Sequence, residues 1–600
     1  MLVQGARPRQ LRWFHAGPML FGDWGTSRLY VLGLAMFYAG HASFWFMLAM
    51  SLLLVGVGWS YQVICRLYPD GGGVYSSARH RSQTLAVVGA LLLCADYIVT
   101  ASLSALDAFH YVGLEHAQWW AAGSIALVGA VNYFGPTKAG TGALIIALLT
   151  IGLSLTIALA SAPSLSEAHI THPQGSPFHW WRQFTALILA ISGVEAVANM
   201  TGIMVKPVER TARRAIWPVL LEIVILNLVL TLAMLAVPAE VLGNGDSTQA
   251  NIAHRDTMMK LLAEYYVGPN FAKVASVVFA LLLLSAVNTA VTDLVSIQYM
   301  MARDKELPHA LGGLNRWGMP VIPLCVAAFA PAVVVLLFPD VGHLADLYAI
   351  GVVGAVALNL GSCSTNFGLS MRKYERLLML ALAALMVVIW LTIAIEKPFA
   401  LGFALTVMGI GLSGRWIAHH REQIREWAVV SVPALAQAGT TATASLAAKA
   451  AALTKRPPAA IPTKTRIMVA TRGNQRLMKF AIEQARLARG ELFVLFVRHI
   501  AVPTMGPARS GDPTHDPEAV ELFSAIQTMA DEAGVSVYFL YSVAYDVAEA
   551  ILETAATFAV DTLLLGTTKR GMLWRAMKGD VMQEVAAQLP ERITLLVHAG

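Results

Sequence analysis

Long apolar segments dominate the first two thirds of this 600-residue chain. A helix needs about 20 apolar residues to cross the hydrocarbon core of a bilayer. With 56% hydrophobic and 13% charged residues, the chain is too apolar to fold as one soluble domain. The sequence therefore predicts an α-helical integral membrane protein with twelve transmembrane helices. The predicted spans cover residues 21–40, 43–66, 84–112, 118–135, 139–161, 182–204, 215–238, 270–298, 320–338, 344–367, 374–395 and 397–413.

Basic residues between the spans predict the orientation of the chain. Most of them fall in alternate loops, as at Arg79, Lys206 and Lys305, whereas the other loops have only Arg255, Lys260 and Lys397 nearby. Loops rich in lysine and arginine stay on the cytoplasmic side. Both termini are therefore expected in the cytoplasm. The net charge of +6 reflects this bias, and no nucleic-acid partner is expected.

Composition changes divide the chain into four regions. Residues 1–20 are a cytoplasmic N-terminus, and residues 21–413 form the transporter domain. Residues 414–465 begin with a basic, tryptophan-containing segment typical of a helix at the membrane surface, and continue as an Ala-, Thr- and Pro-rich linker. Residues 466–600 have the pattern of a soluble α/β domain.

The C-terminal region predicts a wound parallel sheet. Short apolar runs at 467–470, 492–497, 535–540, 561–565 and 593–597 alternate with helical stretches at 475–488, 518–533 and 546–558. Such sheets bind ligands beyond the carboxyl ends of their strands. Gly566, Gly571 and Gly579 follow the fourth strand and precede a helix, which suits a phosphate group. A tight turn into a helix explains the same glycines equally well.

Two glycine-interrupted polar segments occur in spans one and six. The first reads Gly-Asp-Trp-Gly-Thr-Ser-Arg-Leu-Tyr over residues 22–30, and the second reads Ile-Ser-Gly-Val-Glu over residues 191–195. Glycine weakens a helix, so backbone groups at these places can turn toward a cavity. Broken helices at corresponding positions of two halves indicate an inverted-repeat transporter with its site at the membrane midplane.

The third span adds a polar stripe to these segments. Asp96, Thr100 and Ser104 are spaced four residues apart and share one helix face, and Tyr97 is adjacent. With Asp23 and Glu195, this gives three intramembrane acids without a cysteine or histidine. Oxygen ligands favour a hard cation, and buried carboxylates are suited to carrying protons. The residues predict a cation–proton symporter.

Structural roles remain open for several of these residues. Asp96 could neutralise Arg28 within the bundle. The hydroxyls of Thr100, Ser104 and Ser192 could bond the backbone of their own helices. Tyr30 and Tyr97 could serve only in packing.

These motifs together resemble those of a known transporter family. The 22–30 segment, the Asp96-Tyr97-x-x-Thr100-x-x-x-Ser104 stripe and Ser192-x-x-Glu195 resemble the KimA potassium importers of the amino acid–polyamine–organocation superfamily. The first motif is also similar to the Asp-x-Gly-Thr-Ser-x-Leu-Tyr of Kup potassium transporters. Residues 69–75, Pro-Asp-Gly-Gly-Gly-Val-Tyr, resemble the turn that ends span two across the superfamily. Ser192 stands where the family pattern has a threonine, and the hydroxyl is retained.

The resemblance implies a LeuT-like inverted-repeat fold, a homodimer in the bacterial inner (plasma) membrane, and potassium import coupled to protons. It implies no enzymatic activity and no required cofactor. Proton coupling would involve the acids Asp23, Asp96 and Glu195. The residues implied to line the potassium path are Asp23, Tyr30, Asp96, Tyr97, Thr100, Ser104, Ser192 and Glu195, with Tyr348 as a gate on span ten.

The C-terminal region resembles universal stress proteins, which also end the KimA chains. This implies a regulatory nucleotide, cyclic di-AMP or ATP. Lys569 replaces the second glycine of the usual ATP loop and Asp580 replaces a Ser or Thr. An acid beside a phosphate is unfavourable, although nearby basic side chains can offset it. The expected nucleotide-binding residues are Arg472, Gly566, Lys569, Arg570, Gly571 and Gly579.

Two other functions fit the same architecture. An amino acid or polyamine permease would share the fold, but three acids near the site would repel a substrate carboxylate. A membrane sensor would bind a ligand and signal through the stress domain without transport. The sequence predicts the potassium–proton symporter ahead of both, with potassium, protons, a nucleotide and membrane lipid as partners.

Overall fold

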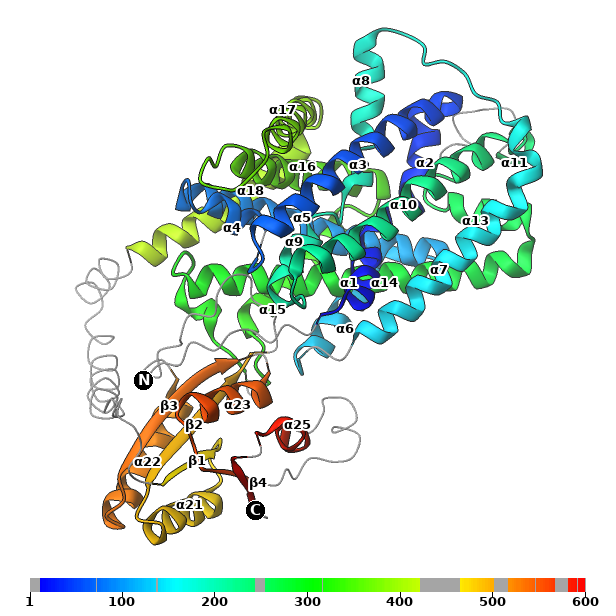
Figure 1. Cartoon of the computed structure of the whole chain (residues 1–600). Coiled ribbons are helices and arrows are strands. Elements are labelled where there is room, and N and C mark those ends of the chain that lie inside the picture. Colours follow the sequence, from blue (N-terminus) through cyan, green and yellow to red (C-terminus); the bar gives the residue numbers. More distant parts are fainter. Residues whose placement is uncertain are drawn as a thin grey trace.

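The computed structural model describes residues 11–420, apart from 72, 136–138, 243–253 and 316, and residues 465–598, apart from 501–515, 545, 567–580 and 591. In this part of the chain, a helical domain precedes a smaller α/β domain (Figure 1). Most of the predicted linker, residues 421–464, lies outside the described residues.

Helices or broken pairs of helices coincide with all twelve predicted spans. Among the described residues, eight helical segments are long and apolar enough to cross a membrane, or nine with the bent pair Pro177–Ala186 and Ile188–Met200. One of the eight, Trp13–Leu67, contains two predicted spans, and two further spans are shorter helices of 16 and 17 residues. The spans are α1 (Trp13–Trp24) with α2 (Ser27–Ala39), α3 (Ser43–Leu67), α5 (Gln83–Val112), α6 (Ala117–Asn132), α7 (Ala139–Ser161), α8 (Pro177–Ala186) with η3 (Ile188–Ile191) and α9 (Ala196–Met200), α10 (Val208–Leu235), α14 (Pro269–Arg303), α15 (Val321–Leu337), α16 (Val341–Ser364), α17 (Lys373–Glu396) and α18 (Pro398–His419).

Short elements connect the spans. Short 3-10 helices follow span one, span five and span six at η1 (Gly40–Ala42), η2 (Ala162–Glu167) and η4 (Thr201–Ile203). The other connecting elements are α4 (Val74–Ala78), α11 (Ala239–Leu242), α13 (Met258–Tyr266) and η5 (His309–Gly312). The first span begins at Trp13, eight residues before its predicted start, and α18 continues past residue 413 to His419.

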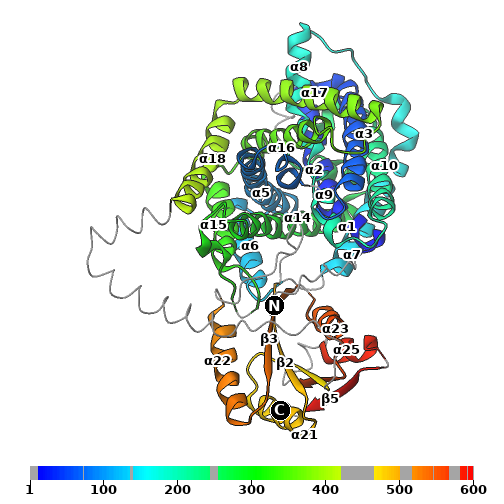
Figure 2. The ribbon, with the colours of Figure 1, turned by 60° about the vertical axis from the view of Figure 1, so that its left-hand side comes forward.

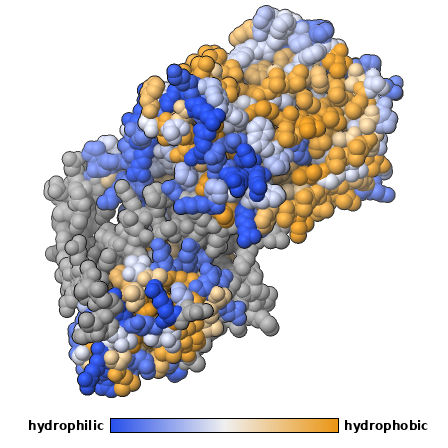
Figure 3. Space-filling model, viewed as in Figure 1, coloured by the Kyte–Doolittle hydropathy of each residue, from blue (hydrophilic) through white to orange (hydrophobic). Residues whose placement is uncertain are grey.

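The helical domain has a central and a peripheral set of helices. In the apolar windows of α5 and α16, 83% of the residues are buried, whereas in α18 only 11% are buried. Figure 2 shows α5 in the middle of the bundle. The outer helices carry exposed apolar side chains, and Figure 3 shows a broad apolar surface over this domain. The outer helices therefore form an apolar surface that can face the membrane, and the central helices are buried inside it. Polar residues at the buried centre are costly and are expected to have a function.

The C-terminal domain is the predicted parallel sheet. Its strands are β1 (Arg466–Ala470), β2 (Glu491–His499), β3 (Val537–Ala544), β4 (Thr562–Gly566) and β5 (Thr594–His598), in the order β3-β2-β1-β4-β5. All four neighbouring pairs are parallel. The helices are α21 (Gln475–Leu487), α22 (Pro517–Glu532), α23 (Val547–Thr557) and α25 (Val581–Gln588).

Alternate residues of the strands supply two apolar cores, one on each face of the sheet. Val469 and Val494 pack with residues of α21 and α22, and Met468 and Leu495 pack with residues of α23. Because both faces are covered, the strands read as continuous apolar runs in the sequence. The predicted fold class, a helical membrane protein with an α/β C-terminal domain, is confirmed.

Candidate functional site

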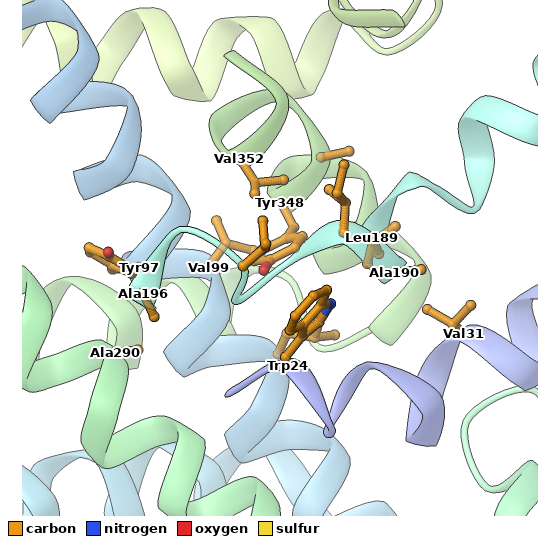
Figure 4. Packing of buried hydrophobic residues seen from close by; sticks show 14 of the residues in the cluster. Trp24, Val31, Tyr97, Val99, Leu189, Ala190, Ala196, Ala290, Tyr348 and Val352 are labelled. Atoms are coloured by element: carbon orange, nitrogen blue, oxygen red, sulfur yellow. The ribbon is translucent and has the colours of Figure 1, made fainter. Parts of the chain in front are cut away.

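The breaks of span one and span six are in direct contact. At Gly193 the backbone has φ +88°, a conformation that favours glycine. A Cβ atom there would lie 2.7 Å from the backbone nitrogen of Trp24 and 3.0 Å from the carbonyl carbon of Asp23. Only glycine therefore allows the two breaks to approach this closely. Figure 4 shows the turn of span six passing beside Trp24 and Tyr348.

The break in span one is stabilised by its own hydroxyls. The helix stops at Trp24 and resumes at Ser27. Thr26 Oγ1 donates to the carbonyl of Asp23, and Ser27 Oγ donates to the carbonyl of Trp24 at 2.8 Å. These bonds satisfy carbonyls that an interrupted helix would leave free. The motif thus positions the Asp23 side chain at a defined break.

Carboxylates gather around this crossing. Asp23, Asp96 and Glu195 are all buried, and their charges interact with one another and with Asp293 of α14. No donor within the described chain is in bonding geometry with either carboxylate oxygen of Asp96 or with Glu195 Oε2. A buried acid without a partner costs several kcal/mol unless it is neutralised. We call Asp23, Asp96, Glu195 and Asp293 the acidic cluster.

Three predicted tyrosines surround the acidic cluster. Tyr30, Tyr97 and Tyr348 are buried, and each interacts electrostatically with both Asp23 and Asp96. The hydroxyl of Tyr97 accepts a hydrogen bond of 2.9 Å from Asn199 Nδ2, whereas the Tyr348 hydroxyl has no partner among the described residues. Phenol oxygens are thus available next to the carboxylates.

The structure decides between the alternatives for two residues. Arg28 forms its ion pair with Glu222 of α10, so the interpretation of Asp96 as a neutralising partner of Arg28 is wrong. Thr100 Oγ1 donates to the Asp96 carbonyl at 2.9 Å, which is the backbone bond that the structural alternative predicts. Its oxygen retains acceptor capacity.

The two serines differ in position. Ser192 is buried at the break of span six, one residue before the glycine that contacts span one. Ser104 is also buried, but it follows Asp96 by eight residues, which is roughly 12 Å along the helix. The structure therefore places Ser192 beside the contact of the two breaks, and Ser104 about two turns from Asp96 along α5.

Sequence reasoning missed two acids within the spans. Asp293 lies within the predicted span 270–298 and joins the acidic cluster. Asp107 lies on α5, and neither of its carboxylate oxygens has a partner among the described residues. Both acids carry the signal that identified Asp96, an acid within an apolar span.

The acidic cluster alone is not arranged as a metal site. Within the described residues, no three His, Cys, Asp or Glu side chains converge as metal ligands. Potassium was predicted to bind the listed path residues, and it would need further oxygens from tyrosines, hydroxyls or free carbonyls at the breaks. Such neutral oxygens are common ligands of alkali cations in membrane proteins.

The predicted nucleotide site lies where β1 and β4 end. These strands are neighbours, and the strand order reverses there. A Cβ on Gly566 would lie 3.7 Å from Asn474 Nδ2, which places the β4 exit beside the β1 exit. Arg472 lies over the Phe496 ring and 3.9 Å from Glu518. Lys569, Arg570, Gly571 and Gly579 lie outside the described residues.

Comparison with protein families accounts for most of the chain. The model of the family described as "Amino acid permease" matches residues 11–415. The chain belongs to the amino acid permease family. Proteins of this family are transporters, and the acidic cluster lies within the matched region of this permease. The model of the universal stress protein family matches residues 464–595, so the permease carries a C-terminal universal stress protein domain.

A solved structure is similar to the C-terminal part of the permease. It is described as a universal stress protein in complex with cAMP, with 18% sequence identity and a TM-score of 0.18. The match covers 23% of this chain and 97% of that chain. The comparison with curated proteins gave no significant match.

Proposed function

We propose that this permease imports potassium together with protons across the bacterial plasma membrane. The acidic cluster carries the proposal, because its four carboxylates lie together without a cationic partner among the described residues, and this favours a positively charged substrate. The three tyrosines, Ser192 and the Thr100 oxygen would complete the path that the KimA resemblance implies. Both termini would lie in the cytoplasm, as the loop charges predict.

The positions of two acids at the helix breaks support the proposed proton coupling. Glu195 lies at the break of span six, and Asp23 lies at the break of span one, which Gly193 contacts. In inverted-repeat transporters one bundle rocks against the other around the site. Rocking would change the surroundings of both acids at once. A carboxyl that binds a proton in one state would release it in the other, alongside potassium.

An amino acid or polyamine is the second candidate substrate, favoured by the family match. An amino acid brings its own carboxylate, which the acidic cluster would repel. A polyamine carries only positive charges and would be attracted. The electrostatics therefore rank potassium and polyamines ahead of neutral amino acids.

We also propose that the universal stress protein domain senses a nucleotide, cyclic di-AMP or ATP, in a homodimeric transporter. The turn after β1 and Gly566 at the end of β4 would contact it, at the switch point of the sheet. Arg472 would have to leave Glu518 to bind a phosphate. This pairing predicts weaker phosphate binding than a free arginine would give.

Tracer uptake identifies the substrate class. Uptake of a rubidium tracer into proteoliposomes would be the readout. Potassium, a neutral amino acid and a polyamine would be added in turn as competitors. Potassium alone should compete. Competition by the amino acid would identify an amino acid as the substrate, and binding of potassium without any uptake would establish a sensor. Empty liposomes and the Glu195→Gln variant are the controls.

A further inference from the structure

A groove opens between the start of α1 and the start of α10, on the predicted cytoplasmic side. It has a volume of about 560 Å³ and is lined by Trp13, Arg213, Arg214, Trp217 and Pro218. The helices α1, α7 and α10 pack together here, and Figure 2 shows them side by side. We call these five residues the basic groove.

The basic groove combines two chemistries. Arg213 and Arg214 are exposed, and neither forms an ion pair or hydrogen bond within the described residues. Trp13 is 45% exposed. The indole of Trp217 is fixed, because its Nε1 donates to Gln62 Oε1 at 2.6 Å. Aromatic rings beside arginines are typical of the level of lipid headgroups.

The outer face of α10 continues the groove into the apolar part of the membrane. Arg214, Pro218, Leu221 and Ile225 are spaced by four, three and four residues, so they share one helix face. Leu221 is 47% and Ile225 is 56% exposed. This face therefore passes from positive charge to exposed hydrocarbon over about three turns. An anionic phospholipid has the same order of groups, from its phosphate to its acyl chains.

We propose that the basic groove binds an anionic phospholipid of the cytoplasmic leaflet. The two arginines would hold the phosphate, the tryptophans would lie at the glycerol level, and the acyl chains would follow Leu221 and Ile225. Basic pockets between transmembrane helices on this side recognise anionic headgroups. Since α1 forms half of span one, the lipid would contact the helix that carries Asp23. The inference does not depend on which substrate is transported.

Native mass spectrometry of the full-length protein tests this site. The protein would be titrated with phosphatidylglycerol and with phosphatidylcholine of identical chains. Each arginine near an anionic surface contributes about fivefold in affinity, so Arg213→Gln with Arg214→Gln should lower phosphatidylglycerol binding by more than about tenfold. Phosphatidylcholine binding should not change. The control, Lys305→Gln with Lys373→Gln, removes two exposed charges outside the groove and should leave the preference intact.

Two outcomes would overturn the proposal. Equal binding of both lipids to the unmodified protein would show that the groove does not select charge. Unchanged phosphatidylglycerol binding with an altered monomer–dimer ratio in the double variant would show that a second copy of the chain covers the groove. Spin-labelled lipids give a test on the unmodified protein: the label on phosphatidylglycerol should be immobilised more than that on phosphatidylcholine, and added salt should reduce the difference.

Discussion

The two domains differ in the hydrogen bonding of their buried acids. In the membrane domain, Asp96 is buried and no donor within the described residues bonds to its carboxylate oxygens. In the C-terminal domain, Asp516 is also buried, but it accepts hydrogen bonds from Arg498, Tyr541 and the backbone of Ala519.

This difference in hydrogen bonding distinguishes acids that stabilise the fold from acids that are candidates for a role in transport. A paired acid such as Asp516 stabilises the fold, because its hydrogen bonds offset the cost of burial. An unpaired acid such as Asp96 destabilises the fold, so its presence in the acidic cluster points to a task in binding or proton transfer. Replacing the two kinds of acid should therefore have opposite effects on stability.

The largest effect is expected in the acidic cluster. Asp96→Asn and Glu195→Gln should each abolish potassium uptake, because under the proposed function each variant removes a charge that would attract the cation and a carboxyl that could carry the proton. The thermal midpoint should stay the same or rise, since a neutral side chain costs less to bury. Uptake and thermal unfolding would be measured on the same preparation. Glu115→Gln, an exposed acid of the α5–α6 loop, is the control and should keep full activity.

A large effect is also expected at the contact between the two broken spans. Gly193→Ala adds a Cβ atom 2.7 Å from the Trp24 nitrogen and places it on a backbone with φ +88°. Strain of about 1–3 kcal/mol should lower the thermal midpoint and the transport rate together. Gly152→Ala adds a Cβ atom in open space and should change neither. Equal behaviour of the two variants would contradict the close contact of the breaks.

In the C-terminal domain, loss of a paired acid should lower the stability of the fold. Asp516→Asn removes one of the two carboxylates that pair with the Arg498 guanidinium, which is only 11% exposed and keeps Glu518 at 2.8 Å, and should cost about 1–3 kcal/mol. Limited proteolysis of the full chain would report the opening of this domain. Glu483→Gln removes an exposed pair with Arg486 and should cost less than about 0.5 kcal/mol. If both variants resisted protease equally, the buried Asp516–Arg498 pair would stabilise the domain no more than the exposed Glu483–Arg486 pair.

The same pair predicts acid sensitivity. Burial alone would raise the pKa of Asp516, but the bonds from Arg498, Tyr541 and Ala519 hold it below its usual value. A lowered folded-state pKa gives stability that is present above the unfolded pKa, about 3.9, and is lost as the pH falls through the folded value. Protease resistance of the domain should therefore fall below about pH 4 in the native chain. Asp516→Asn should lack this step.

The smallest effect is expected at Glu549 of α23. Burial, together with the charges of Asp546 and Glu553, raises its pKa to about 7. A raised folded-state pKa gives stability that is present at low pH and is lost as the pH rises through about 7. Glu549→Gln should remove a change of only a few degrees in the unfolding midpoint between pH 5 and 8. Glu532→Gln, an exposed acid of the same domain, should keep the native profile.

Sequence predicted the fold well because each element carries its own signal. Spans follow from local hydrophobicity, and the strands of a sheet covered on both faces follow from continuous apolar runs. The start of the first span was missed because His15, Gly17 and Pro18 interrupt its apolar character. Whether the polar residues of such a segment are buried depends on tertiary packing, which local hydropathy does not report.

The candidate site was predictable only in part. The glycine breaks indicated Asp23 and Glu195 because a local motif marks them. The pairing of Arg28 with Glu222 joins positions 194 residues apart, and no local pattern predicts which acid an arginine will meet. Asp293 joins the cluster through the packing of α14 against α5, which is likewise a long-range contact.

Potassium-driven proton entry into proteoliposomes tests the central claim most directly. A pH-sensitive dye inside the vesicles would report proton uptake after potassium is added outside. We expect the lumen to acidify with the native protein, and we expect no change with Glu195→Gln. If an amino acid acidifies the lumen and potassium does not, the acidic cluster does not form a cation site and the proposed function is wrong.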